Sequence, residues 1–113
     1  MEAKQMQAVY FIGAGGIGMS AIARYFLHRG LVVAGYDKTP SELTRRLEKE
    51  GMLIHYEENL SEVPHACKRK ESCLVVYTPA IPEDHKELQY FRENGFEIPP
   101  RKALQSRWLW CMI

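Results

Sequence analysis

The sequence predicts one α/β domain over residues 1–98, with three layers built around a five-stranded parallel sheet of strand order 3-2-1-4-5. Short runs of β-branched and aromatic residues alternate with segments whose apolar residues recur at helical spacing. Glycines stand where the predicted helices end. Strands and helices that alternate in this way form parallel sheets with right-handed crossovers, and ligands of such sheets bind at the carboxyl ends of the strands.

Three strands are predicted in the first half of the chain. Each is a short apolar run bounded by glycine or turn residues, and they span residues 9–12, 31–36 and 52–54. The two helices between them are predicted from helical spacing of apolar residues and from the glycines that follow, Gly30 and Gly51. Their apolar positions are Ile17, Ala21, Ile22, Tyr25 and Phe26 in the first helix, and Leu43 and Leu47 in the second.

The second half of the chain is predicted to complete the sheet. Residues 60–70 are weakly helical, with Pro64 in the first turn. A fourth strand is expected at residues 74–77, followed by a glycine-capped helix at 84–94 and a short fifth strand at 96–98.

Composition and charge exclude several classes of function. A formal net charge of +1 with 26% charged residues indicates no preference for nucleic acid or membrane, and no apolar stretch is as long as a membrane span. Glycines interrupt the apolar residues 8–23, which argues against a secretion signal. The three cysteines, Cys67, Cys73 and Cys111, lack the spacing of a disulfide framework or zinc site, so a reducing, cytoplasmic location is expected.

A glycine motif between the first strand and the first helix predicts a site for a diphosphate. Residues 13–18, Gly-Ala-Gly-Gly-Ile-Gly, match the pattern G-x-G-x-x-G in the context of strand, turn and helix that gives it meaning. Gly13 permits the tight turn, Gly15 lets backbone amides approach the anion, and Gly18 allows the helix to pack on the strand. The positive end of the helix dipole then faces the anion. In the alternative interpretation these glycines only make a tight turn.

Asp37 ends the second predicted strand, 19 residues beyond Gly18, where a carboxylate can hydrogen-bond a ribose hydroxyl. Its alternative role is to cap the next helix, for which Thr39 and Ser41 are also available. These features are typical of a Rossmann-like nucleotide site. They support a dinucleotide as well as a uridine diphosphate.

Four segments, in order along the chain, resemble the UDP-N-acetylmuramate:L-alanine ligases of the Mur ligase family. The first, residues 10–25, carries the aromatic-hydrophobic-G-x-G-G-I-G-M-S pattern of these ligases. The others are Gly35-Tyr36-Asp37 with residues 41–47, His55 and Asn59 after the third strand, and residues 77–82 after the fourth. Together they cover roughly residues 8–98 and are more specific than a glycine fingerprint alone.

The resemblance implies a cytoplasmic step of bacterial peptidoglycan synthesis. The complete enzyme uses ATP and magnesium to phosphorylate the carboxylate of UDP-N-acetylmuramate, which L-alanine then attacks. This chain would be the N-terminal domain that holds the UDP moiety. The residues that the resemblance assigns to nucleotide binding are Gly13, Gly15, Gly16, Ile17, Gly18, Met19, Ser20, Asp37, Lys38, His55, Asn59, Thr78, Pro79, Ala80 and Ile81.

The roles within this set differ. Residues 15–19 should receive the diphosphate and Asp37 with its neighbours should face the uridine, while His55, Asn59 and residues 78–81 should close over the nucleotide. The last group also has structural interpretations, as a partly buried histidine at a strand end, a turn cap and a loop shaped by prolines. His65 and His85 match no functional motif and are expected to be solvated.

The sequence contains no segment like the G-x-x-G-K-T phosphate loop with which this family binds ATP. We therefore expect no catalytic residue, metal or cofactor in this chain, and expect ATP and L-alanine to act only through a central and a C-terminal domain that it lacks. Residues 99–113, which carry both tryptophans, depart from the family. This tail docks on the sheet, forms a homodimer contact, or reflects a truncated or frameshifted reading frame.

Two other functions fit the glycine motif. Gly13, Gly15, Gly18 and Asp37 also satisfy the fingerprint of a NAD-binding domain of an oxidoreductase. A non-enzymatic nucleotide sensor, with the Trp-rich tail as its interface, is the other alternative.

Overall fold

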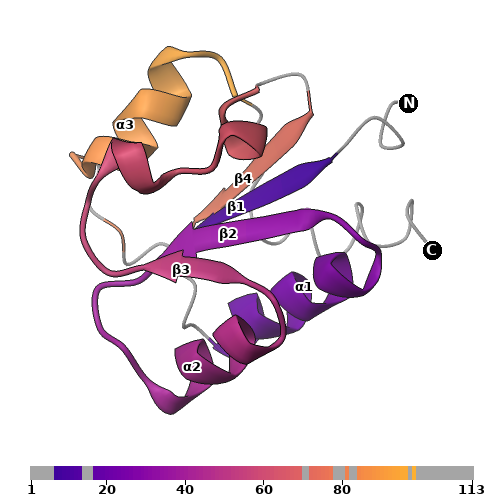
Figure 1. The fold of residues 1–113 in the computed structure, drawn as a ribbon. Coiled ribbons are helices and arrows are strands. Elements are labelled where there is room, and N and C mark those ends of the chain that lie inside the picture. The colour runs from indigo at the N-terminus through magenta and orange to yellow at the C-terminus, as the bar shows by residue number, and fades with distance from the viewer. Residues whose placement is uncertain are drawn as a thin grey trace.

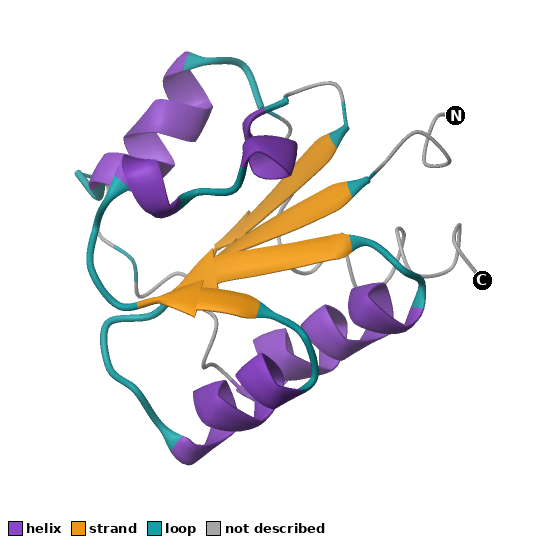
Figure 2. Cartoon of the chain, in the orientation of Figure 1, coloured by secondary structure: helices purple, strands orange, loops and turns teal. Residues whose placement is uncertain are grey.

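The computed structural model describes residues 7–13, 17–69, 72–77, 81, 84–96 and 98. Over these residues the chain has an α/β fold with one parallel sheet of four strands in the order β3-β2-β1-β4. Two helices cover one face of the sheet, and a third helix with two short 3-10 helices covers the other (Figures 1 and 2). The predicted class and the order of the first four strands are confirmed.

The four strands end at the same edge of the sheet. They are β1 (Ala8–Ile12), β2 (Val32–Tyr36), β3 (Leu53–His55) and β4 (Cys73–Tyr77). The pairing puts four residues in one row at the carboxyl edge of the sheet: His55, Tyr36, Ile12 and Tyr77. Side chains and turns that follow these residues therefore meet in one place.

The first face of the sheet is covered by α1 (Ile17–His28) and α2 (Glu42–Lys49). Gly30, which follows α1, has a φ of +83°, a left-handed conformation that glycine adopts without strain. Ser41 begins α2 through a capping box, because its hydroxyl accepts from the Thr44 amide while the Thr44 hydroxyl accepts from the Ser41 amide. Both helices match the prediction to within a few residues at each end.

The second face is covered by the 3-10 helices η2 (Leu60–Glu62) and η3 (His65–Lys68) and by α3 (Lys86–Glu93). The predicted single weak helix at 60–70 is therefore wrong. Pro64 is the reason, since a proline has no N–H with which to continue a helix from the preceding turn. It instead precedes η3 as its N-cap residue.

Alternate side chains of each strand enter two separate cores. The core under α1 and α2 contains Val9, Phe11, Met19, Ile22, Ala23, Phe26, Val33, Leu47, Met52, Leu74 and Val76. The core under α3 and the 3-10 helices contains Ala8, Tyr10, Ile12, Ala34, Tyr36, Val63, Cys67, Cys73, Val75, Leu88, Phe91 and Phe96. The period of two in β1 decides which residues serve which face.

The predicted fifth strand at 96–98 is not seen among the described residues, since Phe96 and Ile98 lie outside the sheet and Glu97 is not described. The backbone of Phe96 has another use. Its amide donates to the Phe91 carbonyl at 3.0 Å, directly after Gly95 at a φ of +77°. This bond closes the end of α3, and the Phe96 side chain packs edge-on against Phe91.

The cysteines of the described region are Cys67 and Cys73, both unpaired and buried. A hydrogen bond with Cys67, together with burial, raises the pKa of the Cys73 thiol well above its usual range. No helix within the described ranges is long and apolar enough to cross a membrane. The described histidine, cysteine and acidic side chains form no group of three that could hold a metal ion.

Candidate functional site

Gly13, the first glycine of the motif, lies directly after β1. Gly13 has a φ of +96° and its amide donates to the Tyr36 carbonyl at 2.7 Å, which turns the chain sharply at the edge of the sheet. The backbone of α1 then starts at Ile17 and continues through Gly18. Met19 and Ser20, in its first turn, are buried, and Met19 belongs to the core below. Gly15 and Gly16 lie outside the described residues.

Asp37 lies beside this turn, directly after β2. Its amide donates to the His55 carbonyl at 3.1 Å, and its carboxylate accepts from the Thr39 amide at 3.2 Å. Because Ser41 caps α2, the alternative interpretation of Asp37 as the cap of that helix is wrong. Lys38 is exposed. Asp37 is half-buried at the carboxyl end of β2.

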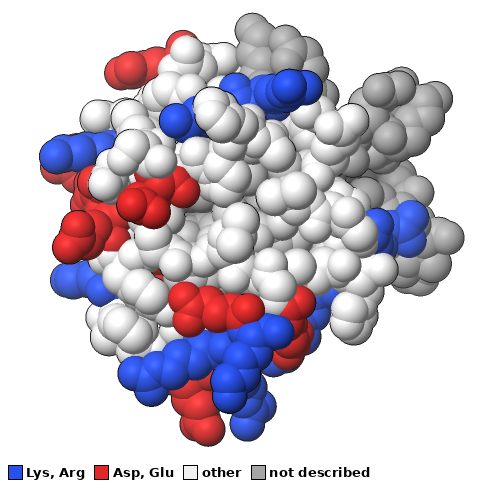
Figure 3. Space-filling view, in the orientation of Figure 1, with Lys and Arg blue, Asp and Glu red and all other residues white. Residues whose placement is uncertain are grey.

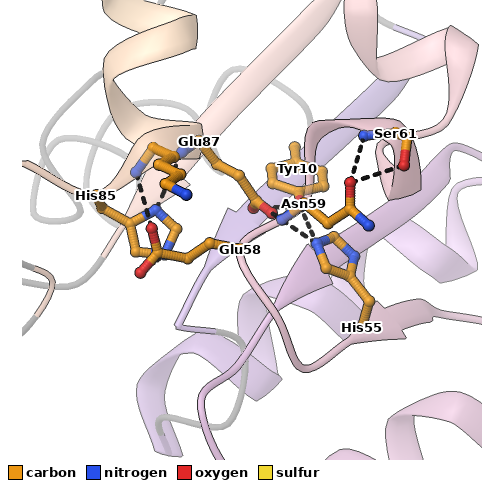
Figure 4. Close-up of polar contacts among 8 residues, drawn as sticks. Tyr10, His55, Glu58, Asn59, Ser61, His85 and Glu87 are labelled. Carbon is orange, nitrogen blue, oxygen red and sulfur yellow. Dashed lines mark hydrogen bonds and ion pairs between the residues drawn. The ribbon is translucent and has the colours of Figure 1, made fainter.

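His55, at the end of β3, is part of a buried polar network (Figure 4). Its Nε2 lies 2.7 Å from the Glu87 carboxylate and 3.1 Å from the Tyr10 hydroxyl. Tyr10 donates to the other oxygen of Glu87 at 2.6 Å, and the Asn59 amide donates to Glu87 at 3.0 Å. Residues distant in sequence thus meet at one carboxylate.

Asn59 has the structural role that was left open for it. Its side-chain oxygen accepts from the amide and the hydroxyl of Ser61, at 3.0 and 2.7 Å, and so caps η2. Its amide is used by Glu87, as described above. The exposed Asn59 side chain therefore lies next to His55 in a fixed loop.

A second set of contacts joins this loop to the start of α3. Glu58 accepts from the Lys86 amide at 3.1 Å, and its other oxygen lies 3.9 Å from Nε2 of His85. His85 is the N-cap of α3, since its Nδ1 accepts from the Glu87 amide at 3.2 Å. The expectation that His85 is solvated is wrong, because it is only 2% exposed. His65 is exposed, as expected.

The electrostatic character of this edge is acidic. Figure 3 shows acidic side chains gathered where the strands end, whereas basic and acidic side chains mix over α2. Burial, and then the charge of Glu87, raises the pKa of the Tyr10 hydroxyl far above its usual value. Burial, and then the charge of Glu58, likewise raises the pKa of Tyr36. Both phenols therefore remain hydrogen-bond donors over the ordinary pH range.

A hollow of about 400 Å³ lies beside His55 along the outer edge of β3. Its lining consists of Glu48, Met52, Leu53, Ile54, His55, Glu62 and Pro64. His55 thus stands between the buried network and open space, with 12% of its side chain exposed.

The family model described as "Mur ligase family, catalytic domain" matches residues 8–108 of this chain. The chain belongs to the Mur ligase family. It is 58% identical over 104 residues to a UDP-N-acetylmuramate–L-alanine ligase of Phocaeicola vulgatus, and 58% identical over 101 residues to one of Parabacteroides distasonis. These matches cover 92% and 89% of this chain but only 23% and 22% of the two relatives.

A solved structure gives the same result for this member of the Mur ligase family. The UDP-N-acetylmuramate-alanine ligase MurC of Thermotoga maritima superposes with a TM-score of 0.73 at 30% identity. The match covers 85% of this chain and 21% of that one. The chain spans less than a quarter of the length of each of these relatives.

In this Mur ligase domain, Gly13, Asp37 and His55 lie at strand ends as the sequence predicts, and their roles in binding stay predictions. The sequence did not indicate Tyr10, Glu87 or the buried position of His85. One signal could have indicated Glu87, because it lies one residue before Leu88 and four before Phe91, on the apolar side of a predicted helix. Of the predicted residues after β4, Ile81 packs against the second core. Thr78, Pro79 and Ala80, like the tail at 99–113, lie outside the described residues.

Proposed function

We propose that this chain is the N-terminal module of a UDP-N-acetylmuramate–L-alanine ligase and binds the UDP part of UDP-N-acetylmuramate. The observation that carries the proposal is the 58% identity, across 92% of the chain, to a ligase of that name. The sharp turn at Gly13, at the carboxyl edge of the sheet, supports it, because this is where parallel α/β sheets bind nucleotides.

The roles that we propose follow the row of strand ends. The glycine loop at 13–18, with the start of α1, holds the diphosphate through backbone amides and the helix dipole. Asp37 and Lys38 meet the ribose side of the nucleotide, and His55 with Asn59 meets the uridine from the end of β3. Residues 78–81 complete the site.

The chemistry of the longer protein would need further segments. ATP, magnesium and L-alanine would bind there, in a cytoplasmic ligase of peptidoglycan synthesis, and this chain would supply no catalytic group. We therefore expect no alanine-dependent ATP hydrolysis when the 113-residue chain is mixed with UDP-N-acetylmuramate. Such hydrolysis would contradict the proposal that this chain binds the nucleotide while other segments carry out the ATP-dependent reaction.

Calorimetric titration of the chain with UDP-N-acetylmuramate, UDP and NADH tests the proposal. We expect UDP-N-acetylmuramate and UDP to bind and to compete with each other. Preference for NADH would instead favour a NAD-binding domain, which Asp37 at the end of β2 also permits. Binding of UDP that changes the oligomeric state in light scattering would favour a nucleotide sensor.

Two matched variants locate the site. Gly15→Leu should abolish UDP binding while the circular dichroism spectrum stays unchanged, because a side chain there blocks the approach of the diphosphate to the backbone. Ala21→Leu adds the same kind of bulk to the exposed side of α1 and should bind UDP normally. Equal affinity of both variants would remove the glycine loop from the site.

A further inference from the structure

Glu87 is the one buried acidic side chain among the described residues, and it is 0% exposed. It lies on the side of α3 that packs on the sheet, next to Leu88. Removing a carboxylate from water is costly unless hydrogen bonds and opposite charge compensate, and an apolar residue at such a position is often as stable or more so. Packing of α3 therefore gives no reason for a glutamate here.

Three donors from three parts of the chain converge on this carboxylate. The Tyr10 hydroxyl of β1 donates to one oxygen at 2.6 Å. His55 Nε2 at the end of β3, at 2.7 Å, and the amide of Asn59, at 3.0 Å, share the other oxygen. Figure 4 shows all three directed toward Glu87. A carboxylate can accept all three at once, which a glutamine amide with its single acceptor oxygen cannot.

The carboxylate determines how His55 is presented. Because a carboxylate only accepts, Nε2 of His55 must carry the hydrogen of their 2.7 Å contact. The ring is flanked by Tyr10 and Tyr36, with centroids 6.2 and 6.0 Å away. The second ring nitrogen points away from Glu87 in Figure 4. One orientation of the ring, with a hydrogen on Nε2, is thereby selected. Carboxylates that bind the second nitrogen of a functional histidine commonly have this effect.

Two hydrogen bonds to carboxylates, one in each direction, hold the loop around His55 against α3. Glu58 of the loop accepts from the Lys86 amide of α3 at 3.1 Å. In the opposite direction, Glu87 of α3 accepts from the Asn59 amide of the loop at 3.0 Å. The loop at 55–59 and the start of α3 are therefore held together at two points, at the edge of the sheet where the nucleotide is proposed to bind.

We propose that Glu87 is a positioning residue of the nucleotide site, which fixes the orientation and the tautomer of His55 so that Nδ1 of the ring meets the uridine of the ligand. This inference rests on the proposed function. Glu87 touches no ligand itself and acts through His55 and the loop at 55–59. The diphosphate, bound by the glycine loop, lies outside its influence.

Binding measurements with two ligands test this role. Glu87→Gln should weaken the binding of UDP by about five- to tenfold, which corresponds to one well-oriented hydrogen bond. The affinity for inorganic pyrophosphate, measured by NMR titration, should stay unchanged. Glu93→Gln, an exposed glutamate of the same helix, is the matched control and should bind both ligands as the wild type does. Equal loss of both ligands would indicate a general structural effect and overturn the proposal.

A double-mutant cycle shows whether Glu87 acts through His55. We expect His55→Ala to weaken UDP by a similar factor, and the double variant with Glu87→Gln to be no weaker than either single variant. If the double variant instead lost UDP affinity by the product of the two single factors, the two residues would act independently and the proposal would be overturned. Should Glu87→Gln fail to fold, Tyr10→Phe removes one partner of the carboxylate and should produce a smaller loss for UDP alone.

A spectroscopic measurement reports the positioning directly. Long-range ¹⁵N–¹H spectra of the histidine rings should show His55 in a single form with Nε2 protonated, and a mixture of forms in Glu87→Gln. The His55→Ala variant assigns the signal. An unchanged His55 tautomer together with unchanged UDP affinity in Glu87→Gln overturns the role of Glu87 and leaves the proposed function standing. Failure of the wild-type chain to bind UDP overturns both.

Discussion

The two faces of this sheet are built on different principles. The face under α1 and α2 is covered by two helices, and the buried polar side chains of these helices, Ser20 and Thr44, are uncharged. The face under α3 and the 3-10 helices has a comparable set of apolar residues but also encloses the charge of Glu87 and the ring of His85. Neighbouring residues of β1 serve the two sides, Phe11 the first and Tyr10 the second.

This difference separates stability from binding. Burial of apolar surface needs no particular orientation, so the first face can be optimised by packing alone. Buried polar groups must find partners with correct geometry, which restricts the second face but holds His55 in one position. We infer that mutations on the first face change mainly the free energy of unfolding, whereas mutations on the second also change nucleotide affinity.

The largest effect is expected in the first core. Phe26→Ala should lower the free energy of unfolding by about 3–5 kcal/mol, because it empties a fully buried position between α1 and the sheet. Phe91→Ala, at a fully buried position of the other face, should lose a similar amount and also weaken UDP, since it loosens α3 and with it Glu87. Urea unfolding and calorimetry on the folded fraction separate the two effects. Equal UDP affinity in both variants would contradict the division between the faces.

A smaller loss is expected where the backbone of the sheet is most crowded. A Cβ on Gly35, in β2, would stand 2.6 Å from the Phe11 carbonyl oxygen and 3.1 Å from the Met52 methyl group. Gly35→Ala should therefore lower the free energy of unfolding by about 1–3 kcal/mol in a urea titration. Gly30→Ala is the control, since it has open space but a φ of +83°, and it should cost about 1 kcal/mol from backbone strain. A smaller loss of unfolding free energy in Gly35→Ala than in Gly30→Ala would mean that β1 and β2 can move apart.

The sequence allowed the fold and part of the site to be predicted, because these depend on local patterns. Gly13 and Asp37 directly follow strands and His55 is the last residue of one, so the parallel arrangement alone brings them to one edge of the sheet. Glu87 could not be placed in this way, since its partners Tyr10 and His55 are 77 and 32 residues distant. The prediction of Phe96 as part of a fifth strand failed for a related reason.

Phenylalanine is a residue type common in strands, but the amide of Phe96 donates its hydrogen bond to the helix before it. Local pattern cannot tell which partner a backbone group will choose when two are available. The same limit applies to His85, whose burial depends on Tyr36 of β2, with a ring-centroid distance of 4.7 Å.

The buried Tyr10 of the second face should make the free energy of unfolding depend on alkaline pH. Its folded-state pKa is raised above the value of 10.0 expected for an exposed phenol. The corresponding stabilisation is complete below about pH 10 and declines above it, by at most about 1.4 kcal/mol per pH unit. Tyr10→Phe removes this titration but also a hydrogen bond. Urea unfolding should therefore show a deficit for the variant at about pH 8 that narrows at about pH 11. A constant deficit would mean that Tyr10 ionises as readily in the folded chain as in the unfolded one.

The smallest effects are expected at two helix caps, one on each side of the sheet. Ser41→Ala removes the hydroxyl that accepts from the Thr44 amide at 3.2 Å, and should cost about 1 kcal/mol in urea unfolding. Asn59→Ala removes the oxygen that accepts from Ser61 at 3.0 Å and should cost no more, since η2 is shorter. Only Asn59→Ala should also weaken UDP, because this cap holds the loop that carries His55. Reduced UDP affinity in Ser41→Ala, with unchanged affinity in Asn59→Ala, would place the nucleotide on the α2 side of the sheet and would reverse the comparison between the faces.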